Sequence, residues 1–271
     1  MKDKYVQKLS KKSGKEIVVG IKKMQYFLFA LLIILALVGI YWYSITLNSD
    51  NKNFTNIIFI FMIMIAFLIF AFFLCFSRIL SSIIDFVFYE QIDFEKYLEI
   101  LDILYKIEKN KKIKKEYFQI NRFGMGQVEY FSGNFEKSLH ILERIDLSKV
   151  TLRHRDFYQN SILYFKCLNY IMLKDVKKVE EMHQSFRTNS RENSVQNILE
   201  IIKGNVSDYV FESEPRTKLV KIGRCYYQAL NYLNANDKSS AKENFQKIAN
   251  ENPELFYVRE AKKYLEELDN K

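Results

Sequence analysis

Residues that break helices are scarce in this chain. Its 271 residues include only 2 prolines and 8 glycines, whereas turn-rich β architectures need many of both. The chain also has 23 phenylalanines and 18 tyrosines, and 49% of its residues are hydrophobic, which excludes a disordered protein. The composition therefore favours long helices. Its abundance of Lys, Asn, Ile, Phe and Tyr is typical of a protein from an AT-rich bacterial genome.

Cysteine is scarce as well. Cys75, Cys167 and Cys225 lie far apart in the sequence. This spacing fits neither a disulfide framework nor a zinc site. We therefore interpret all three as small, buried apolar side chains.

Acidic residues are few near the N-terminus. Residues 1–24 contain eight Lys and two acidic residues, a net charge of +6 out of +9 for the whole chain. The rest of the excess is spread thinly over residues 78–271. The basic segment has few aromatic residues and no motif for reading bases, so we expect no nucleic-acid partner. We expect it to attract anionic lipid headgroups instead, at about 1 kcal/mol per residue.

Two segments, 25–47 and 57–77, contain no charged residue. Each reaches the roughly 20 residues that cross a hydrocarbon core as a helix. The first apolar run is too long for a cleaved signal peptide, and a second span follows it closely. We predict two transmembrane helices over 25–77, joined by a short external loop at 48–56.

The charge distribution orients this hairpin. Lys and Arg accumulate on the cytoplasmic side of membranes, so we place the basic tail 1–24 in the cytoplasm. Two crossings return the chain to that side, where Arg78 follows the second span. The predicted location is the cell membrane, multi-pass, with the N- and C-termini cytoplasmic. Neither span contains an ionisable residue of the kind that transport paths need, so we expect the hairpin to be an anchor.

The chain becomes less apolar after the second span. Residues 78–92 include Asp85 and Glu90, which predicts a juxtamembrane helix: an extension of the span, a segment on the bilayer surface, or a first helix packed under the soluble part. Beyond it, apolar residues recur at three- and four-residue spacing. We therefore assign 93–271 to a cytoplasmic helical domain. We interpret the basic run 109–115 as a solvated helix junction rather than a binding patch.

A pattern of small and large residues occurs twice in this domain. In each copy a small residue is followed twelve positions later by another and four positions further by a large one: Gly126, Ser138 and Leu142, then Ala229, Ala241 and Phe245. Small residues let the two helices of a hairpin approach closely, and large ones fill the remaining gaps. A weaker third copy is centred on Cys167, with Tyr170, Val179 and His183 in the corresponding places.

These residues resemble the tetratricopeptide repeat (TPR), whose pattern is small, aromatic, small, aromatic and a terminal proline. One copy matches it through Ala229, Tyr232, Ala241, Phe245 and Pro253. The other matches through Gly126, Gly133, Phe135, Ser138 and Leu142, but has Glu129 where an aromatic residue is usual.

The resemblance implies stacked antiparallel helix pairs, since one pair cannot bury its own apolar face. It leaves residues 190–215 irregular and makes 255–268 a terminal capping helix. The predicted fold is all-α: a transmembrane helical hairpin followed by a TPR-like α-solenoid of antiparallel helix pairs.

No catalytic motif is present in the sequence. His140, His154 and His183 lie far apart and pair with no Cys or carboxylate at metal-ligand spacing. The sequence also has no phosphate-cradling loop, nucleophile elbow or paired-acid motif. We therefore expect no enzyme, no metal and no cofactor. An enzyme would need polar groups that only folding brings together.

The TPR resemblance also implies a concave groove lined by the first helix of each pair. The residues one turn from the packing positions are Phe123, Gln127, Tyr130, Phe131, Tyr164, Leu168, Met172, Tyr226, Leu230 and Asn234. They are mostly aromatic or apolar, so the hypothesised ligand is an apolar or aromatic peptide segment or an amphipathic helix. The other interpretation is that these residues pack between repeats.

Two functions follow as hypotheses. The first is a membrane-anchored TPR-like adaptor or scaffold that binds a protein or apolar peptide segment at the cytoplasmic face of a bacterial membrane. The second is a bacteriocin-type immunity or peptide-response membrane protein, in which the hairpin itself meets a membrane-active peptide or a transporter.

Overall fold

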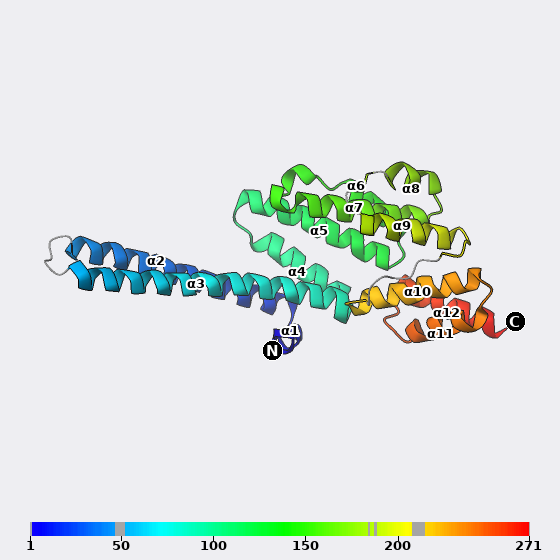
Figure 1. Ribbon diagram of the computed structural model, residues 1–271, viewed down its shortest axis with the longest axis horizontal. Helices are drawn as coiled ribbons and strands as arrows, with labels where there is room; N and C mark the ends of the chain where they lie inside the picture. The colour runs from blue at the N-terminus through cyan, green and yellow to red at the C-terminus, as the bar shows by residue number, and fades with distance from the viewer. Residues whose placement is uncertain (1, 47–51, 184, 187–188, 208–214, 271) are drawn as a thin grey trace. The chain divides into compact units, whose positions relative to one another are not determined.

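The computed structural model describes residues 2–46, 52–183, 185–186, 189–207 and 215–270 (Figure 1). These residues form helices and no strand, which confirms the predicted all-α class. They divide into two compact units, Met1–Phe88 and Tyr89–Lys271. Each unit is described by itself.

The first unit consists of α1 (Lys2–Leu9), α2 (Gly14–Thr46) and α3 (Lys52–Phe86). The predicted basic tail is therefore helical, formed by α1 and the first turns of α2. α2 and α3 lie side by side as a hairpin (Figure 1), and both are long and apolar enough to cross a membrane. Of the predicted loop 48–56, residues 48–51 lie outside the described residues and residues 52–56 begin α3.

The hairpin exposes apolar side chains along its length. Phe67 is 71% exposed, Tyr41 68% and Ile40 67%. Water would solvate such a surface poorly, whereas lipid tails match it. Gln25 and Ser77, at the two predicted span limits, are joined by a hydrogen bond of 2.8 Å from Gln25 Nε2 to Ser77 Oγ. One end of the hairpin is thus held by a satisfied polar pair.

The juxtamembrane segment 78–92 continues the second long helix. α3 runs to Phe86 without interruption and passes into a π-helical segment, η1 (Val87–Gln91). Ile92 then ends the helix with a φ of 56°, a conformation that β-branched residues rarely adopt. The segment is therefore helical and continuous with the second apolar helix.

The described part of the second unit is built from helices of 8 to 21 residues. They are α4 (Phe94–Ile107), α5 (Lys111–Phe131), α6 (Phe135–Glu143), the 3₁₀ turn η2 (Leu147–Lys149), α7 (Leu152–Met172), α8 (Val176–His183), α9 (Asn189–Ile202), α10 (Lys218–Asn234), α11 (Lys238–Ala249) and α12 (Phe256–Asp269).

Three helix pairs, α5–α6, α7–α8 and α10–α11, share one kind of turn. Each first helix is followed by a residue with positive φ: Gly133 at 81°, Lys174 at 61° and Asn236 at 61°. The N–H of the next residue, an Asn or Asp, donates at 2.8–2.9 Å to the carbonyl five residues earlier. This bonding closes the last helical turn. The three sequence copies, including the weak one around Cys167, thus coincide with three hairpins of like geometry.

The small residues lie where the paired helices approach. A Cβ atom on Gly126 would be 2.7 Å from Leu142 Cδ2, and Ser138 Oγ donates to the Gly126 carbonyl oxygen at 2.7 Å. In α10–α11, Ala229 and Ala241 are fully buried. Contact between the backbones of each pair therefore depends on the absence of larger side chains.

Other repeat residues lie elsewhere than the TPR pattern implies. Tyr232 is 39% exposed and Pro253 is also exposed, so both are less buried than Ala229, Ala241 and Phe245 of the same copy. Residues 189–202 form α9 rather than an irregular segment. Its apolar residues recur at helical spacing and bury one face: Val195, Ile198, Leu199 and Ile201.

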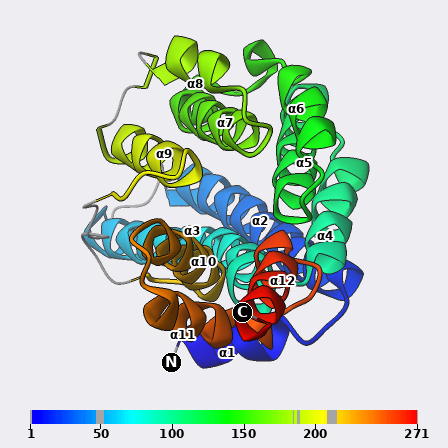
Figure 2. The same cartoon turned by 90° about the vertical axis from the view of Figure 1, so that its right-hand side faces the viewer.

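The second unit does not remain an open row of hairpins. In Figure 2, α5, α7 and α9 follow one another round an arc, and α10 and α12 lie on its remaining side. Arg259 of α12 donates to the Ser132 carbonyl oxygen at 2.7 Å, and Asn252 donates to the Ile92 carbonyl oxygen at 2.9 Å. The end of the chain therefore packs against the beginning of the same unit.

The close approach at Gly126 gives a stability prediction. We expect Gly126→Ala to be about 1–3 kcal/mol less stable than Gly223→Ala, because the new methyl group overpacks Leu142. At Gly223 the nearest atom to a Cβ is at an ordinary 3.4 Å. Both changes gain the same helix propensity, so the difference between their free energies of unfolding reports the packing of the new methyl group. Chemical unfolding of the full chain in detergent, followed by far-UV circular dichroism, measures it, and equal midpoints would contradict close packing.

Candidate functional site

The residues predicted to line a groove are largely buried inside the second unit. Six are at most 8% exposed: Phe123, Gln127, Tyr130, Leu168, Tyr226 and Leu230. Phe131, Tyr164, Met172 and Asn234 are half-buried. The structure therefore places most of these residues in contacts within the unit, which is closer to the interpretation that they pack between helices than to a groove. An open groove lined by all ten is not what the chain forms.

Tyr130 is the centre of these contacts. Its side chain, on α5, is fully buried, and its hydroxyl lies 3.1 Å from the hydroxyl of Tyr227 on α10 and 3.1 Å from that of Tyr257 on α12. A buried hydroxyl without a partner costs about 1–3 kcal/mol. The three tyrosines satisfy one another and join three helices that are distant in sequence.

Aromatic rings surround this hydroxyl cluster. The Tyr130 ring lies 5.5 Å from Phe165 and 5.7 Å from Phe256, both nearly edge-on, and Tyr226 lies 5.1 Å from Tyr257. Edge-to-face pairs at such distances contribute about 0.5–1.5 kcal/mol each. The inner face of the arc is thus filled by the chain's own α10 and α12.

Sequence reasoning missed four of the six residues of this cluster. Phe165, Tyr227, Phe256 and Tyr257 were not among the predicted residues, and 255–268 was interpreted only as a capping helix. That helix is α12, displaced by one residue, and it buries four side chains at its start. The adjacent pairs Tyr226-Tyr227 and Phe256-Tyr257 were the available signal, because two neighbouring aromatic residues on a helix cannot both face water cheaply.

Burial keeps the tyrosine hydroxyls of the cluster protonated. Desolvation raises the pKa of Tyr130 and of Tyr227 well above the usual value near 10, and the nearby hydroxyls add to it for Tyr130. Desolvation likewise raises the pKa of the Cys167 thiol to about 12. A thiol with this pKa is not a thiolate near neutral pH. The cluster is suited to packing and hydrogen bonding rather than to nucleophilic chemistry.

The two predicted amide side chains also bond within the unit. Gln127 accepts a hydrogen bond of 3.4 Å from the Tyr97 hydroxyl of α4. Asn234 Nδ2 donates to the carbonyl oxygens of Ile201 and Asn205 at 2.8 and 2.9 Å, which fastens the end of α10 to the end of α9. These amides therefore hold helices together.

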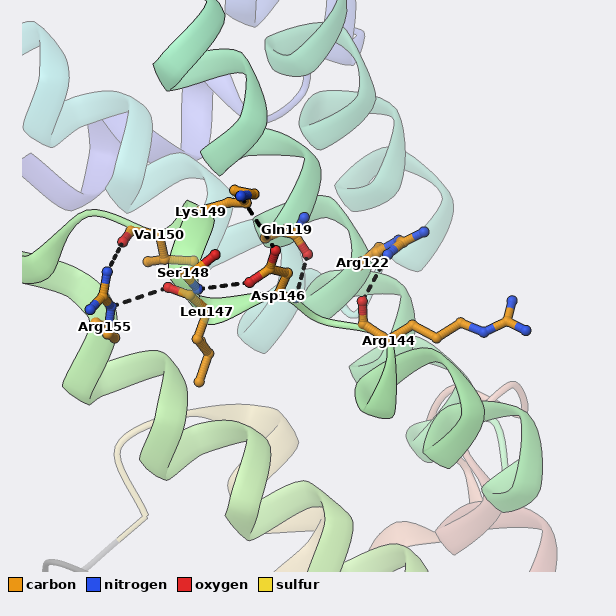
Figure 3. Close-up of polar contacts among 9 residues, drawn as sticks. All are labelled: Gln119, Arg122, Arg144, Asp146, Leu147, Ser148, Lys149, Val150 and Arg155. Carbon is orange, nitrogen blue, oxygen red and sulfur yellow. Dashed lines mark hydrogen bonds and ion pairs between the residues drawn. The ribbon is translucent and has the colours of Figure 1, made fainter.

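A second polar region joins α5 to the segment between α6 and α7 (Figure 3). Gln119 Oε1 accepts the N–H of Asp146 at 2.9 Å, and Arg122 Nη1 donates to the Arg144 carbonyl oxygen at 2.8 Å. Arg155 donates to the carbonyl oxygen of Leu147 at 3.1 Å. Hydrogen bonds from Ser148 lower the pKa of Asp146. The connection is therefore fixed by side chains from both helices.

Glu116 adds a contact between the first turns of α5 and α7. It is 6% exposed, and its Oε1 lies 3.0 Å from Thr151 Oγ1 and 3.0 Å from His154 Nδ1. Thr151 Oγ1 and His154 Nδ1 are themselves 3.3 Å apart. Two of these contacts meet at Glu116 Oε1, and together the three position the start of α7.

The structure describes the side chains of two of the three histidines. His140 and His154 are exposed on different helices, and the side chain of His183 lies outside the described residues. Among the residues that the structure describes, no group of three or more His, Cys, Asp and Glu could hold a metal.

Comparison with known proteins adds no relative. No protein-family model, curated protein or solved structure matches this chain. The TPR resemblance therefore stays a prediction that rests on the residues quoted for it.

Loss of the Tyr130 hydroxyl should destabilise the second unit. Tyr130→Phe leaves the hydroxyls of Tyr227 and Tyr257 buried without their shared partner, at a cost of about 1–3 kcal/mol. Changing all three tyrosines to Phe removes the stranded groups, so we expect that variant to recover part of the loss. Tyr232→Phe, at an exposed tyrosine, is the control. Unfolding midpoints of the full chain in detergent measure the effect, and a triple variant weaker than the single one would contradict it.

The same cluster should make stability fall in alkali. Below pH 10 the hydroxyls are protonated in both states, so pH has no effect through them. Above about pH 10 the unfolded chain ionises while the folded tyrosines, with raised pKa values, do not, which costs about 1.4 kcal/mol per pH unit for each such group. We expect the wild-type unfolding midpoint to fall more steeply above pH 10 than that of the triple Phe variant. Parallel curves would contradict the prediction.

Proposed function

We propose that the protein is a membrane-anchored helical scaffold that binds a protein or an apolar peptide segment at the cytoplasmic face of a bacterial membrane. One observation carries the proposal. A single chain joins an apolar hairpin of membrane-spanning length to a separate unit that contains three helix pairs with the same turn. Repeated helix pairs are common frames for binding peptides and proteins, and anchoring raises the local concentration of membrane-bound partners.

The proposed contact surface is narrower than the sequence predicted. Because the C-terminal helices fill the inner face, the predicted residues that remain partly accessible are Phe131, Tyr164, Met172 and Asn234. Tyr164 and Met172 lie on one helix, α7, together with the buried Leu168. An apolar peptide helix could pack along this side of α7.

The orientation is part of the proposal. The lysines of residues 1–24 lie on α1, in the turn that follows it and on the first turns of α2, at the end of the hairpin that Gln25 and Ser77 fasten. The positive-inside rule puts that end in the cytoplasm. The same lysines would contact anionic lipid headgroups.

A second candidate function is favoured by a groove on the hairpin. Residues of α2 and α3 line an apolar groove of about 380 Å³, with Gly39 and Met62 among them. A membrane-active peptide entering there would make the protein an immunity or peptide-response protein, in which the hairpin is the binding element. Replacing both spans by unrelated apolar helices distinguishes the two functions: a scaffold keeps its partner, and an immunity protein loses its protection.

Photocrosslinking of the full chain in bacterial membranes tests the scaffold. We place a benzoylphenylalanine at Met172 and, as control, at Tyr232, which is exposed on α10. We expect a discrete adduct from Met172 and none from Tyr232, because only α7 carries the proposed contact surface. No adduct at Met172, or the same adducts at both positions, would contradict the proposal.

A further inference from the structure

One end of the second unit gathers basic and exposed apolar side chains. It is formed by the start of α5 and by the connection from α6 into α7, residues 109–122 and 144–157, which we call the basic end. Hydrogen bonds tie the two segments together. Glu116 bonds to Thr151 and His154, and Gln119 bonds to Asp146 (Figure 3 shows the latter). The two segments therefore form one continuous surface.

Charge is segregated to this end. The two segments contain ten Lys and Arg residues and three Asp and Glu residues, a net charge of +7 with His154 neutral. Residues 89–271 carry +3 in all, so the rest of the unit carries −4. The excess of positive charge, which looks thinly spread in the sequence, is therefore concentrated at one end of the folded unit.

The lysines of the basic end are available to a partner. Lys111, Lys112 and Lys115 are exposed, and within the described residues none of them forms an ion pair. Arg122 and Arg155 differ, because they donate to backbone carbonyl oxygens and hold the connection in place. Lys111, Lys112 and Lys115, near the start of α5, are thus exposed positive charges that a partner can reach.

Exposed apolar side chains lie among these lysines. Leu152 and Phe157 are 79% and 59% exposed, the highest values for large apolar residues among the described part of the second unit, and Ile113 is 39% exposed. Leu152 adjoins Thr151, which bonds to Glu116, and Ile113 lies one turn before Glu116. Apolar residues set among lysines are typical of surfaces that lie in the headgroup region of a bilayer.

We propose that the basic end docks on an anionic lipid bilayer, with Leu152, Phe157 and Ile113 in the headgroup region and the lysines facing lipid phosphates. This inference rests on the proposed membrane anchoring, because the second unit belongs to the same chain as the two apolar helices, and the anchor keeps it near the membrane. It replaces the interpretation of 109–115 as a solvated junction.

The chemistry favours lipid over nucleic acid. Single-stranded nucleic acids are held by aromatic side chains on which bases stack, whereas the most exposed apolar residue here, Leu152 at 79%, is aliphatic, as is Ile113. Aliphatic side chains gain by leaving water for lipid tails. Each lysine near an anionic surface adds about 1 kcal/mol, and the spans hold the unit beside that surface.

Tryptophan fluorescence of the full chain in vesicles tests the docking. Trp42 is the only tryptophan and lies in the first apolar helix, so the wild-type protein reports span insertion by itself. In a Trp42→Phe background, the tryptophan introduced by Leu152→Trp reports whether the basic end contacts lipid. Val220→Trp, at an exposed site on α10, is the matched control.

The vesicles contain phosphatidylcholine with a headgroup-labelled nitroxide lipid, either with or without phosphatidylglycerol. We expect quenching of the tryptophan at position 152 in the anionic vesicles, several-fold weaker quenching in the neutral ones, and little at position 220. Changing Lys111, Lys112 and Lys115 to Gln should reduce the quenching, and so should added salt, because salt screens exposed charges.

The outcomes separate the inference from the proposed function. If Trp42 of the wild type is not quenched by a nitroxide on the lipid tails, the membrane anchor itself is wrong. If Trp42 is quenched but position 152 is not, or is quenched equally without phosphatidylglycerol, the docking is wrong and the anchor stands. A signal at position 152 that responds to a single-stranded RNA oligonucleotide and not to anionic lipid would also overturn the docking.

Discussion

The hydroxyl group of Tyr130 is the constraint on which the helical unit depends. It lies within hydrogen-bond distance of two tyrosines that are 97 and 127 positions further along the chain. Closing such long loops costs conformational entropy, and a few edge-on aromatic pairs at the same place offset it. Once these contacts form, α10 and α12 are fixed against α5, and the arc of helices is closed. The turns of the three hairpins are local, so they do not by themselves determine this closure.

Closure changes what the unit can bind. In an open array of helix pairs the inner face is free, and aromatic residues there are available to a ligand. Here α10 and α12 bring Tyr227, Tyr257 and Phe256 into contact with Tyr130 on that face. These residues occupy positions that a bound peptide would contact in an open array. The surfaces proposed to contact partners are the less buried side of α7 and the basic end. Both are more exposed than the six predicted groove residues that the structure buries.

Local patterns were predictable from the sequence, and the long-range contacts were not. The limits of the apolar spans followed from charge alone, and Gln25 and Ser77 at those limits proved to be bonded to each other. The twelve-residue spacing located all three hairpins, because it reflects contact between adjacent helices. No regular spacing in the sequence indicates that Tyr130 contacts Tyr257. Tyr232 fits the repeat pattern but is 39% exposed, and α9 was overlooked because it belongs to no repeat.

The basic end shows why arginine and lysine have different roles in the same region. Glu116 is a buried carboxylate, which is costly to desolvate unless hydrogen bonds satisfy it, and Thr151 and His154 supply them. The arginines nearby donate to carbonyl oxygens of the α6–α7 connection through a planar group that suits fixed geometry. Lysines, with a flexible stem and a strongly hydrated charge, remain at the surface. Arg122 and Arg155 thus build the connection, whereas Lys111, Lys112 and Lys115 stay exposed in the same region as Leu152 and Ile113.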